Sequence, residues 1–380
     1  MKNKRLIAIF LTFALTFLPC VPAFALDLNN VTILPTDFAL EQVTVIDAND
    51  AECPWSDETV IASTITLYNM EQKPNGYVFK LKTGVVESGF IQIHVIDGAY
   101  SLYCYAYEGD SEIECMMEYW QIDLNKISHV YFVGSFKYLI GSDDGKYLDV
   151  SSNSYVDYSQ NELKNIEENY ISNVLERASV LEANSAVYTQ IYDTTRGSDD
   201  EFTWPITSDF SNLTITYRGV THSVHDHCTP TAATAIVRYL NHLGRTQCSS
   251  GETLNQTFRE MYIALNTNEI RFDDSSSSGT GTSRAQIVEG IRYYANTNGY
   301  SLAVARPSSV SLNDMKSHLN NSRLLLVSLQ DFAGTSGGHS VVVTGYSSDT
   351  LRIQNGWSRN RVSYAYSSLD IVQYVYVGGY

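Results

Sequence analysis

A single cysteine in the C-terminal half stands where a run of histidines gives way to small, helix-forming residues. The stretch reads HSVHDHCTPTAATAIVRYL, residues 222–240, and its cysteine is Cys228. Pro230 fits the first turn of a helix that begins there. A thiol at such a position lies at the positive end of the helix dipole, which favours its ionised, nucleophilic form. The alternative for Cys228 on its own is a small apolar packing residue.

Two further motifs supply the partners that a nucleophilic thiol needs. His339 follows two glycines and opens an apolar strand in GGHSVVVTGY, so it can face a cleft at the edge of a sheet. Asn355 ends the next strand in IQNGW, and its carboxamide can accept from one imidazole nitrogen and leave the other for the thiol. Trp357 can shield that bond from water. The alternatives are a hydrogen-bonded core histidine and a turn asparagine.

In this order, CTPTAATAIVRYL, GGHSVVVTGY and IQNGW resemble motifs of the papain-like cysteine peptidases. The closer resemblance is to the bacterial branch of bacteriocin-leader (double-glycine) peptidases, over about residues 200–380. It implies that Cys228 is the nucleophile, His339 the general base and acid, and Asn355 the orienting residue. It also implies a cysteine peptidase that hydrolyses peptide bonds through a thioester acyl-enzyme. No GxGxxG or phosphate-loop signature occurs, so no cofactor is predicted.

The chain departs from the family pattern beside its cysteine. Thr229 stands where the family usually has glycine. Six residues before Cys228, where the family has a glutamine that helps to bind the oxyanion, the chain has His222. The resemblance therefore implies His222 as the oxyanion-hole side chain, next to the backbone N–H of Cys228. The alternatives for this role lie in the same stretch: Ser223, His225 and His227.

Other chemistries remain open for the same residues. The histidines, Asp226 and Cys228 are all potential zinc ligands, but neighbouring positions in one turn rarely converge on a tetrahedral centre. No CxxC or HExxH pair occurs elsewhere, so we predict no metal. Two further functions are compatible with the motifs. One is an exported peptidoglycan amidase or endopeptidase, and the other is a surface binding protein with a catalytically degenerate peptidase domain.

The elements that must position these residues change character along the chain. Between about residues 26 and 150, segments such as GYVFKLKTG and FIQIHVIDG are rich in β-branched and aromatic residues, which predicts an antiparallel sheet. A helix is expected over about residues 159–186, before a polar stretch near 195–200. We therefore predict that residues 26–195 form a β-rich domain that ends in a helix. This domain is either an accessory domain or a propeptide, and a propeptide would keep the enzyme inactive.

The remaining residues, 200–380, show helices first and strands last, an α+β layout. Helices are predicted over about 228–242, 252–266 and 284–299, and Ser311 before Asp314 marks the start of a fourth. Strands follow from about residue 323. This order predicts a papain-like catalytic domain, with N-terminal helices and a C-terminal antiparallel sheet. Strand aromatics such as Tyr103 and Tyr364 are expected to pack on the faces of the sheets.

The first 25 residues have the pattern of a secretory signal. Three basic residues precede an apolar run from Leu6 to Leu18, and a small-x-small site ends at Ala25. We expect cleavage after about Ala25 and an extracellular protein without stable membrane insertion.

The net charge of the exported chain limits the classes of partner that it can bind. Three of the 25 basic residues and none of the 42 acidic ones lie in the signal, which leaves 22 basic and 42 acidic residues and a net charge of −20. This balance disfavours nucleic acid as a partner, because the phosphate backbone would be repelled. The expected partner is a peptide or protein substrate, or a cell-wall peptide, bound by a monomer.

Five cysteines follow the signal, and an odd count leaves at least one thiol unpaired even in an oxidising compartment. Cys104 and Cys115 can face each other across a hairpin. The sequence does not decide the connectivity among Cys53, Cys104, Cys115 and Cys248.

Overall fold

The structure is a computed structural model, and the predicted signal sequence lies outside the residues that it describes. These are residues 33–50, 53–123, 126–141, 146–151, 154–156, 158–183, 192–193, 202–271, 281–330 and 338–379. Within those ranges, no helix combines the length and the apolar character that a membrane span requires.

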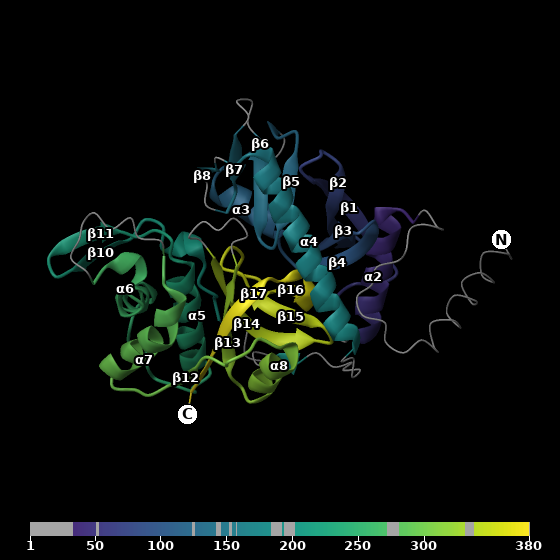
Figure 1. The fold of residues 1–380 in the computed structure, drawn as a ribbon. Coiled ribbons are helices and arrows are strands. Elements are labelled where there is room, and N and C mark those ends of the chain that lie inside the picture. The colour runs from purple at the N-terminus through teal and green to yellow at the C-terminus, as the bar shows by residue number, and fades with distance from the viewer. Residues whose placement is uncertain are drawn as a thin grey trace.

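The N-terminal half is built around a sheet whose strands are antiparallel except for one pair (Figure 1). The strands β1 to β4 follow one another as neighbours, β5 joins β1 in parallel, and β6 to β8 extend that edge. The strands are β1 Thr59–Tyr68, β2 Pro74–Thr83, β3 Val86–Ile96, β4 Ala99–Ala106, β5 Val130–Gly134, β6 Lys137–Gly141, β7 Tyr147–Asp149 and β8 Ser154–Val156. The helices of this half are α2 Pro35–Asn49, α3 Glu112–Tyr119 and α4 Gln160–Ala183.

Two of these helices were not expected from the β-like pattern of this half. The first, α2, starts with Pro35 in its first turn and packs Phe38 and Val43 onto the sheet. The second, α3, starts at a capping box in which the Ser111 N–H donates to the Glu114 carboxylate at 2.9 Å. Both helices are short or weakly amphipathic, so their apolar residues resemble those of strands. The third, α4, lies within the predicted 159–186 helix.

The C-terminal half has helices first and strands last, as the sequence predicts. A small hairpin of β10 and β11 precedes the helices, and the strands after them are antiparallel neighbours. The helices are α5 Cys228–His242, α6 Leu254–Ala264, α7 Ile287–Thr297 and α8 Leu312–Asn320. The strands are β9 Tyr192–Asp193, β10 Thr214–Tyr217, β11 Val220–Ser223, β12 Ala303–Ala305, β13 Leu324–Leu329, β14 His339–Ser347, β15 Thr350–Gln354, β16 Val362–Ala365 and β17 Ile371–Gly378.

The two halves share one sheet. Strand β16 of the C-terminal half pairs antiparallel with β4 of the N-terminal half, through Ser363 opposite Tyr105 and Tyr364 opposite Cys104. The sheet therefore runs in the order β12-β17-β13-β14-β15-β16-β4-β3-β2-β1-β5-β6-β7-β8, with β9 beside β14. The hydrogen-bonded ladder of the sheet is therefore continuous from one half of the protein to the other.

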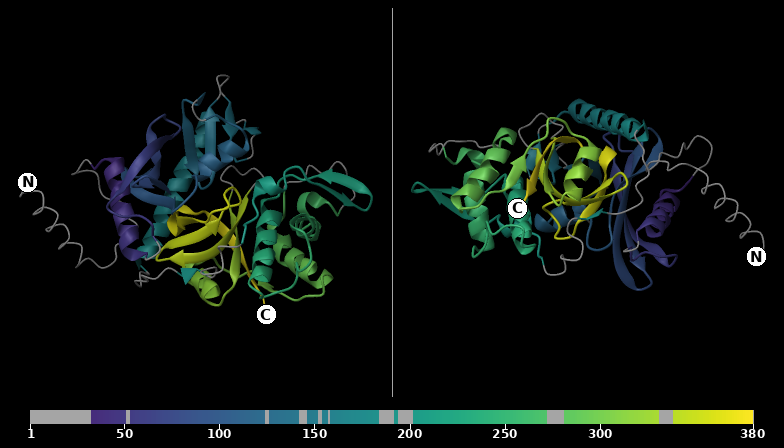
Figure 2. Two further views of the ribbon diagram at one scale, coloured as in Figure 1. Left: turned by 180° about the vertical axis from the view of Figure 1, so that it is seen from behind. Right: turned by 90° about the horizontal axis from the view of Figure 1, so that it is seen from below.

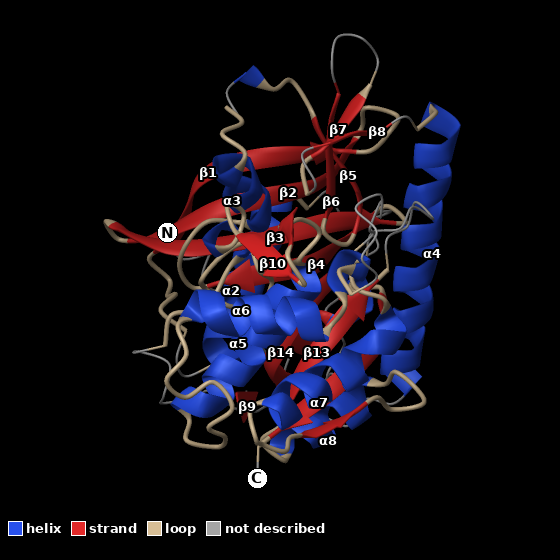
Figure 3. Ribbon diagram, turned by 90° about the vertical axis from the view of Figure 1, so that its left-hand side faces the viewer, coloured by secondary structure: helices blue, strands red, loops and turns tan. Residues whose placement is uncertain are grey.

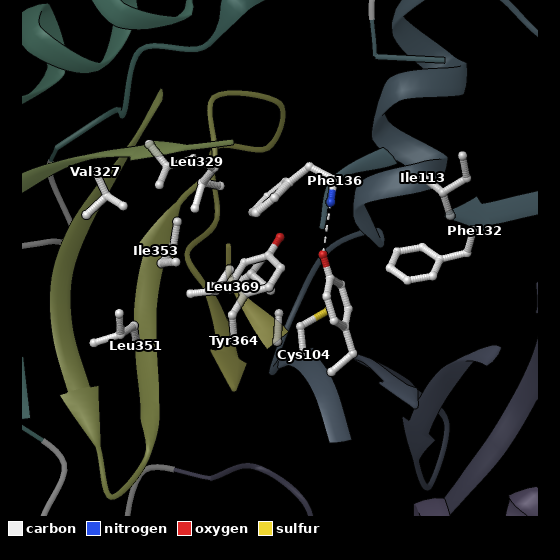
Figure 4. Close-up of a cluster of buried hydrophobic side chains, with 14 of the residues drawn as sticks. Cys104, Ile113, Phe132, Phe136, Val327, Leu329, Leu351, Ile353, Tyr364 and Leu369 are labelled. Atoms are coloured by element: carbon white, nitrogen blue, oxygen red, sulfur yellow. Dashed lines mark hydrogen bonds between the residues drawn. The ribbon is translucent and has the colours of Figure 1, made fainter. Parts of the chain in front are cut away.

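The C-terminal strands bury both of their faces. In β13, Leu324 and Leu326 belong to the core beneath α5, α6 and α7, whereas Leu325 and Val327 belong to a core shared with the N-terminal half and α8. Successive strand residues point to opposite faces, so the apolar run LLLVSL needs a cover on each side. Figure 2 shows the helices α5 to α7 on one side of these strands and the N-terminal half on the other. Figure 4 shows the shared core, where side chains from both halves meet.

Helix α4 fastens the two halves from outside. It runs along one edge of the molecule (Figure 3), packs on β5 and reaches the turn Tyr366–Ser368. Arg177 of α4 donates to the Ser367 carbonyl at 3.0 Å and pairs with the Asp370 carboxylate at 2.6 Å. The ion pair is largely buried, so it is screened less by salt than a surface pair.

The five described cysteines have free thiols. Cys104 lies inside the shared core, whereas Cys115 lies on α3 and its thiol faces the Asp110 carbonyl. These two residues therefore do not form the hairpin pair that the sequence allowed.

We expect the two halves to unfold together. Phe132 of β5 is 2% exposed, and its ring lies 4.1 Å from that of His94 and 5.4 Å from that of Tyr103. A Phe132→Ala change should cost about 3–5 kcal/mol, because it leaves a cavity in the shared core. In thermal unfolding, it should lower the midpoint of one common transition.

The fully exposed Val85 provides the control, since Val85→Ala should change stability by less than about 0.5 kcal/mol. Two transitions, of which Phe132→Ala moves only one, would contradict a shared core.

Candidate active site

Cys228 is the first residue of α5, the helix at the centre of the C-terminal half. Pro230 lies in the first turn, where a missing N–H costs no helical hydrogen bond. Most residues from Thr229 to Leu240 are buried, because α5 packs against β13 and β14 on one side and α6 on another. The burial of the rest of the helix holds the partly exposed Cys228 at a defined place near the end of β14.

His339 is the first residue of β14, and the glycine before it is required by close packing. A Cβ on Gly338 would lie 2.5 Å from the Leu329 carbonyl oxygen of the neighbouring strand. The Cys228 thiol faces the Gly338 carbonyl, with Sγ and the oxygen 3.7 Å apart. The glycine before His339 thus brings the strand close to its neighbour and to the cysteine, as the glycine-rich motif suggested.

Cys228 and His339 line the same small cavity. The other residues around it are Thr207, Thr231, Ala232, Ser340, Gln354 and Gly356. Beside it, the Thr229 and Ser340 hydroxyls lie 2.8 Å apart and tie the first turn of α5 to β14. Thr229, where the resembling family usually has glycine, therefore has a structural role in joining the two elements that carry the cysteine and the histidine.

The imidazole of His339 is oriented by a backbone carbonyl. Its Nε2 lies 2.7 Å from the Asn355 carbonyl oxygen. Since a carbonyl oxygen can only accept, Nε2 carries the hydrogen of the neutral ring. Nδ1 is then the proton acceptor. A histidine in this tautomer can take a proton from a thiol.

This contact differs from the predicted one, in which the Asn355 carboxamide would accept from the imidazole. The side-chain oxygen of Asn355 instead accepts from the N–H groups of Trp357 at 2.9 Å and Ser358 at 3.1 Å. Its Nδ2 donates to the Tyr364 hydroxyl at 3.2 Å. The carboxamide is used to form the turn after β15, because an asparagine before glycine readily bonds the backbone that follows it. Asn355 and His339 are brought together, but through the main chain.

Two aromatic rings flank His339. The Trp357 ring is stacked on the imidazole, with centroids 6.3 Å apart and planes inclined by 23°. The second ring is Phe136, from the turn between β5 and β6 of the N-terminal half, at 5.4 Å. The Ser135 hydroxyl beside it donates to the Ser368 carbonyl. The position of Trp357 agrees with a shielding role, whereas Phe136 has no sequence signal because it lies in the other half of the chain.

Burial keeps the two candidate catalytic groups neutral. It lowers the pKa of His339 to about 4, against the opposing effect of the bond to the Asn355 carbonyl. Burial also raises the pKa of the Cys228 thiol, and hydrogen bonds from Ser340 and Thr229 oppose this rise only in part. Both pKa shifts disfavour charge, so at neutral pH a thiol and a neutral imidazole are favoured over a thiolate–imidazolium pair.

His222 is not brought to Cys228. It lies on β11 opposite Ile215 and lines a separate cleft of about 240 Å³ with Tyr262, Asn268 and other residues. Its position six residues before the cysteine therefore does not place it in the cavity of Cys228, because the β10–β11 hairpin leads the chain away. His227 is buried instead, with its Nδ1 3.0 Å from the Thr231 hydroxyl.

His225 is exposed, and its Nδ1 lies 2.8 Å from the Asp226 carboxylate. Among the described residues, no three His, Cys, Asp or Glu side chains are grouped so as to hold a metal ion.

The C-terminal half is similar to a known family. Residues 213–377, which include Cys228, His339 and Asn355, match the model of the Peptidase_C39 like family. No curated protein matches the chain.

Two solved structures are similar to about half of this chain. One is described as a C39-like peptidase from Bacillus anthracis, with 11% identity, 46% of this chain and 98% of that chain covered, and a TM-score of 0.30. The other is the interpain A cysteine protease of Prevotella intermedia, with 12% identity, 50% and 93% covered, and a TM-score of 0.31.

The neutral resting pair predicts how Cys228 reacts as pH changes. Because burial raises the pKa of the Cys228 thiol, the rate of its alkylation by iodoacetamide should still be rising above about pH 8.5, the ordinary thiol value. The rate is measured by mass spectrometry of the Cys228 peptide over a series of pH values. A plateau that is already reached near pH 6 would contradict the neutral pair.

Proposed function

We propose that the protein is an exported cysteine peptidase that uses Cys228 as nucleophile and His339 as general base and acid. The observation that carries the proposal is the shared cavity of the two side chains, in which the His339 tautomer leaves Nδ1 as the proton acceptor. The match of residues 213–377 to the Peptidase_C39 like family supports it. Asn355 takes the orienting role through its carbonyl oxygen.

The reaction begins with transfer of the Cys228 proton to His339 Nδ1. The thiolate adds to the carbonyl carbon of a peptide bond, and the carbonyl electron pair moves onto oxygen. Backbone N–H groups in the first turn of α5 have no partner within the helix and are donors of the kind that stabilise an oxyanion. His339 then gives its proton to the departing amine as the C–N bond breaks, which leaves a thioester on Cys228.

Hydrolysis of the thioester restores the site. His339 takes a proton from water while the water oxygen adds to the thioester carbon. The C–S bond then breaks, the carboxylic acid leaves, and the proton returns to the Cys228 sulfur. Trp357, stacked on the imidazole, limits the access of water to the bond that orients His339.

The exported location follows from the signal-like pattern of the first 25 residues, and a monomer acting on peptides or proteins is the simplest assembly. We further propose that the N-terminal half is a retained accessory domain. The support is the pairing of β16 with β4 and the core that both halves share. A propeptide that leaves on activation would expose both a strand edge and that core.

A cut between the halves tests this second proposal. A recognition site for a specific protease is introduced between residues 194 and 201, and the cut chain is compared with the uncut chain by gel filtration. The two fragments should elute together and keep the activity of the uncut chain. Separation of the N-terminal fragment, with a rise in activity, would instead identify a propeptide.

Removal of the thiol tests the peptidase proposal. Cys228→Ala should lower casein hydrolysis by about a thousandfold or more, since the variant has no nucleophile. Thermal unfolding should change little, because the residue is small and partly exposed. Cys115→Ala is the matched control, as it removes another partly exposed thiol and should leave hydrolysis unchanged.

Purified cell wall serves as a second substrate in the same assay. Cleavage of the wall and not of casein would assign the activity to wall peptides. Equal casein hydrolysis by Cys228→Ala and by the unmodified chain would contradict the thiol mechanism. Absence of activity together with an unreactive Cys228 would favour a binding protein with a degenerate peptidase domain.

A further inference from the structure

Tyr364 of β16 joins Asn355 to the N-terminal half. Its hydroxyl accepts from Asn355 Nδ2 at 3.2 Å, and both side chains are completely buried. The Tyr364 ring is held between two aromatic rings of the N-terminal half, Tyr103 at 5.5 Å and Phe136 at 5.0 Å. Figure 4 shows Phe136 and Tyr364 meeting where the two halves join.

The Tyr364 hydroxyl accepts in this bond, because the amide nitrogen of Asn355 can only donate. A buried polar group that loses its partner is costly, so this arrangement holds the Asn355 amide in one orientation.

We propose that Tyr364 is a positioning residue for His339. Its hydroxyl fixes the Asn355 side chain, and with it the turn whose carbonyl oxygen holds His339 Nε2 at 2.7 Å. The N-terminal half thus completes the catalytic site, an inference that rests on the proposed roles of Cys228 and His339.

The structure contains a matched control for this inference. Tyr138 is also completely buried, but its hydroxyl lies 3.2 Å from Gln92 Oε1 and 3.2 Å from Glu112 Oε2, and Asn355 is not among its partners. Tyr138→Phe and Tyr364→Phe therefore remove the same kind of hydroxyl from the same shared core. Only the second change removes a partner of Asn355.

The experiment compares these two variants in the full chain. For each one, kcat and KM for casein, the pH profile of Cys228 alkylation by iodoacetamide, and the midpoint of thermal unfolding are measured. Tyr364→Phe should lower kcat by about tenfold with KM within about twofold, and should change the alkylation profile, because His339 is less well oriented. Tyr138→Phe should lower the thermal midpoint by a similar amount but keep the kcat and alkylation profile of the unmodified chain.

Equal effects of Tyr364→Phe and Tyr138→Phe on kcat and on the alkylation profile would overturn the positioning role. Failure of the proposed function has a different signature, because the unmodified chain would then show no hydrolysis that depends on Cys228.

Discussion

The C-terminal sheet must be covered on both faces, and the rest of the structure depends on this constraint. Leu325 and Val327 point away from the helices, toward a core that also contains Phe132 and Tyr103 of the N-terminal half. A sheet with apolar residues on both faces cannot leave one of them in water. The helices α5 to α7 cover the first face, and the N-terminal half with α8 covers the second. The pairing of β16 with β4 is the backbone counterpart of this packing.

The same constraint shapes the chemistry of the candidate site. Cys228 and His339 lie where the helix layer meets the sheet, so burial disfavours charge on both groups. A neutral thiol–imidazole pair costs less to bury than an ion pair, and it becomes charged only as the proton moves. The orienting bond from His339 goes to a main-chain carbonyl, which needs no charge. The side chain of Asn355 bonds the turn that follows it and the Tyr364 hydroxyl. Tyr364 in turn packs against the N-terminal half, so it links the site to that half.

Some of this arrangement could be predicted from local sequence. The start of α5 at Cys228, the start of β14 at His339 and the end of β15 just before Asn355 each follow from short-range signals: a proline in a first turn, two glycines before an apolar run, and an Asn-Gly turn. The roles of His222 and Tyr364 could not be predicted in this way. The β10–β11 hairpin carries His222 into a separate cleft, and Tyr364, expected to be sheet packing, is a hydrogen-bond partner of Asn355.

The amino-acid sequence by itself determined the residue types that can do chemistry, their order along the chain, and the helix and strand ends on which they stand. These depend on interactions between residues close in sequence. Only the tertiary structure decided that His339 is held by the carbonyl of Asn355, that Phe136 lies beside it, and that Tyr364 contacts both Asn355 and Phe136. Those contacts join residues far apart in the chain. They exist because two halves with incomplete cores bury one face of a common sheet between them.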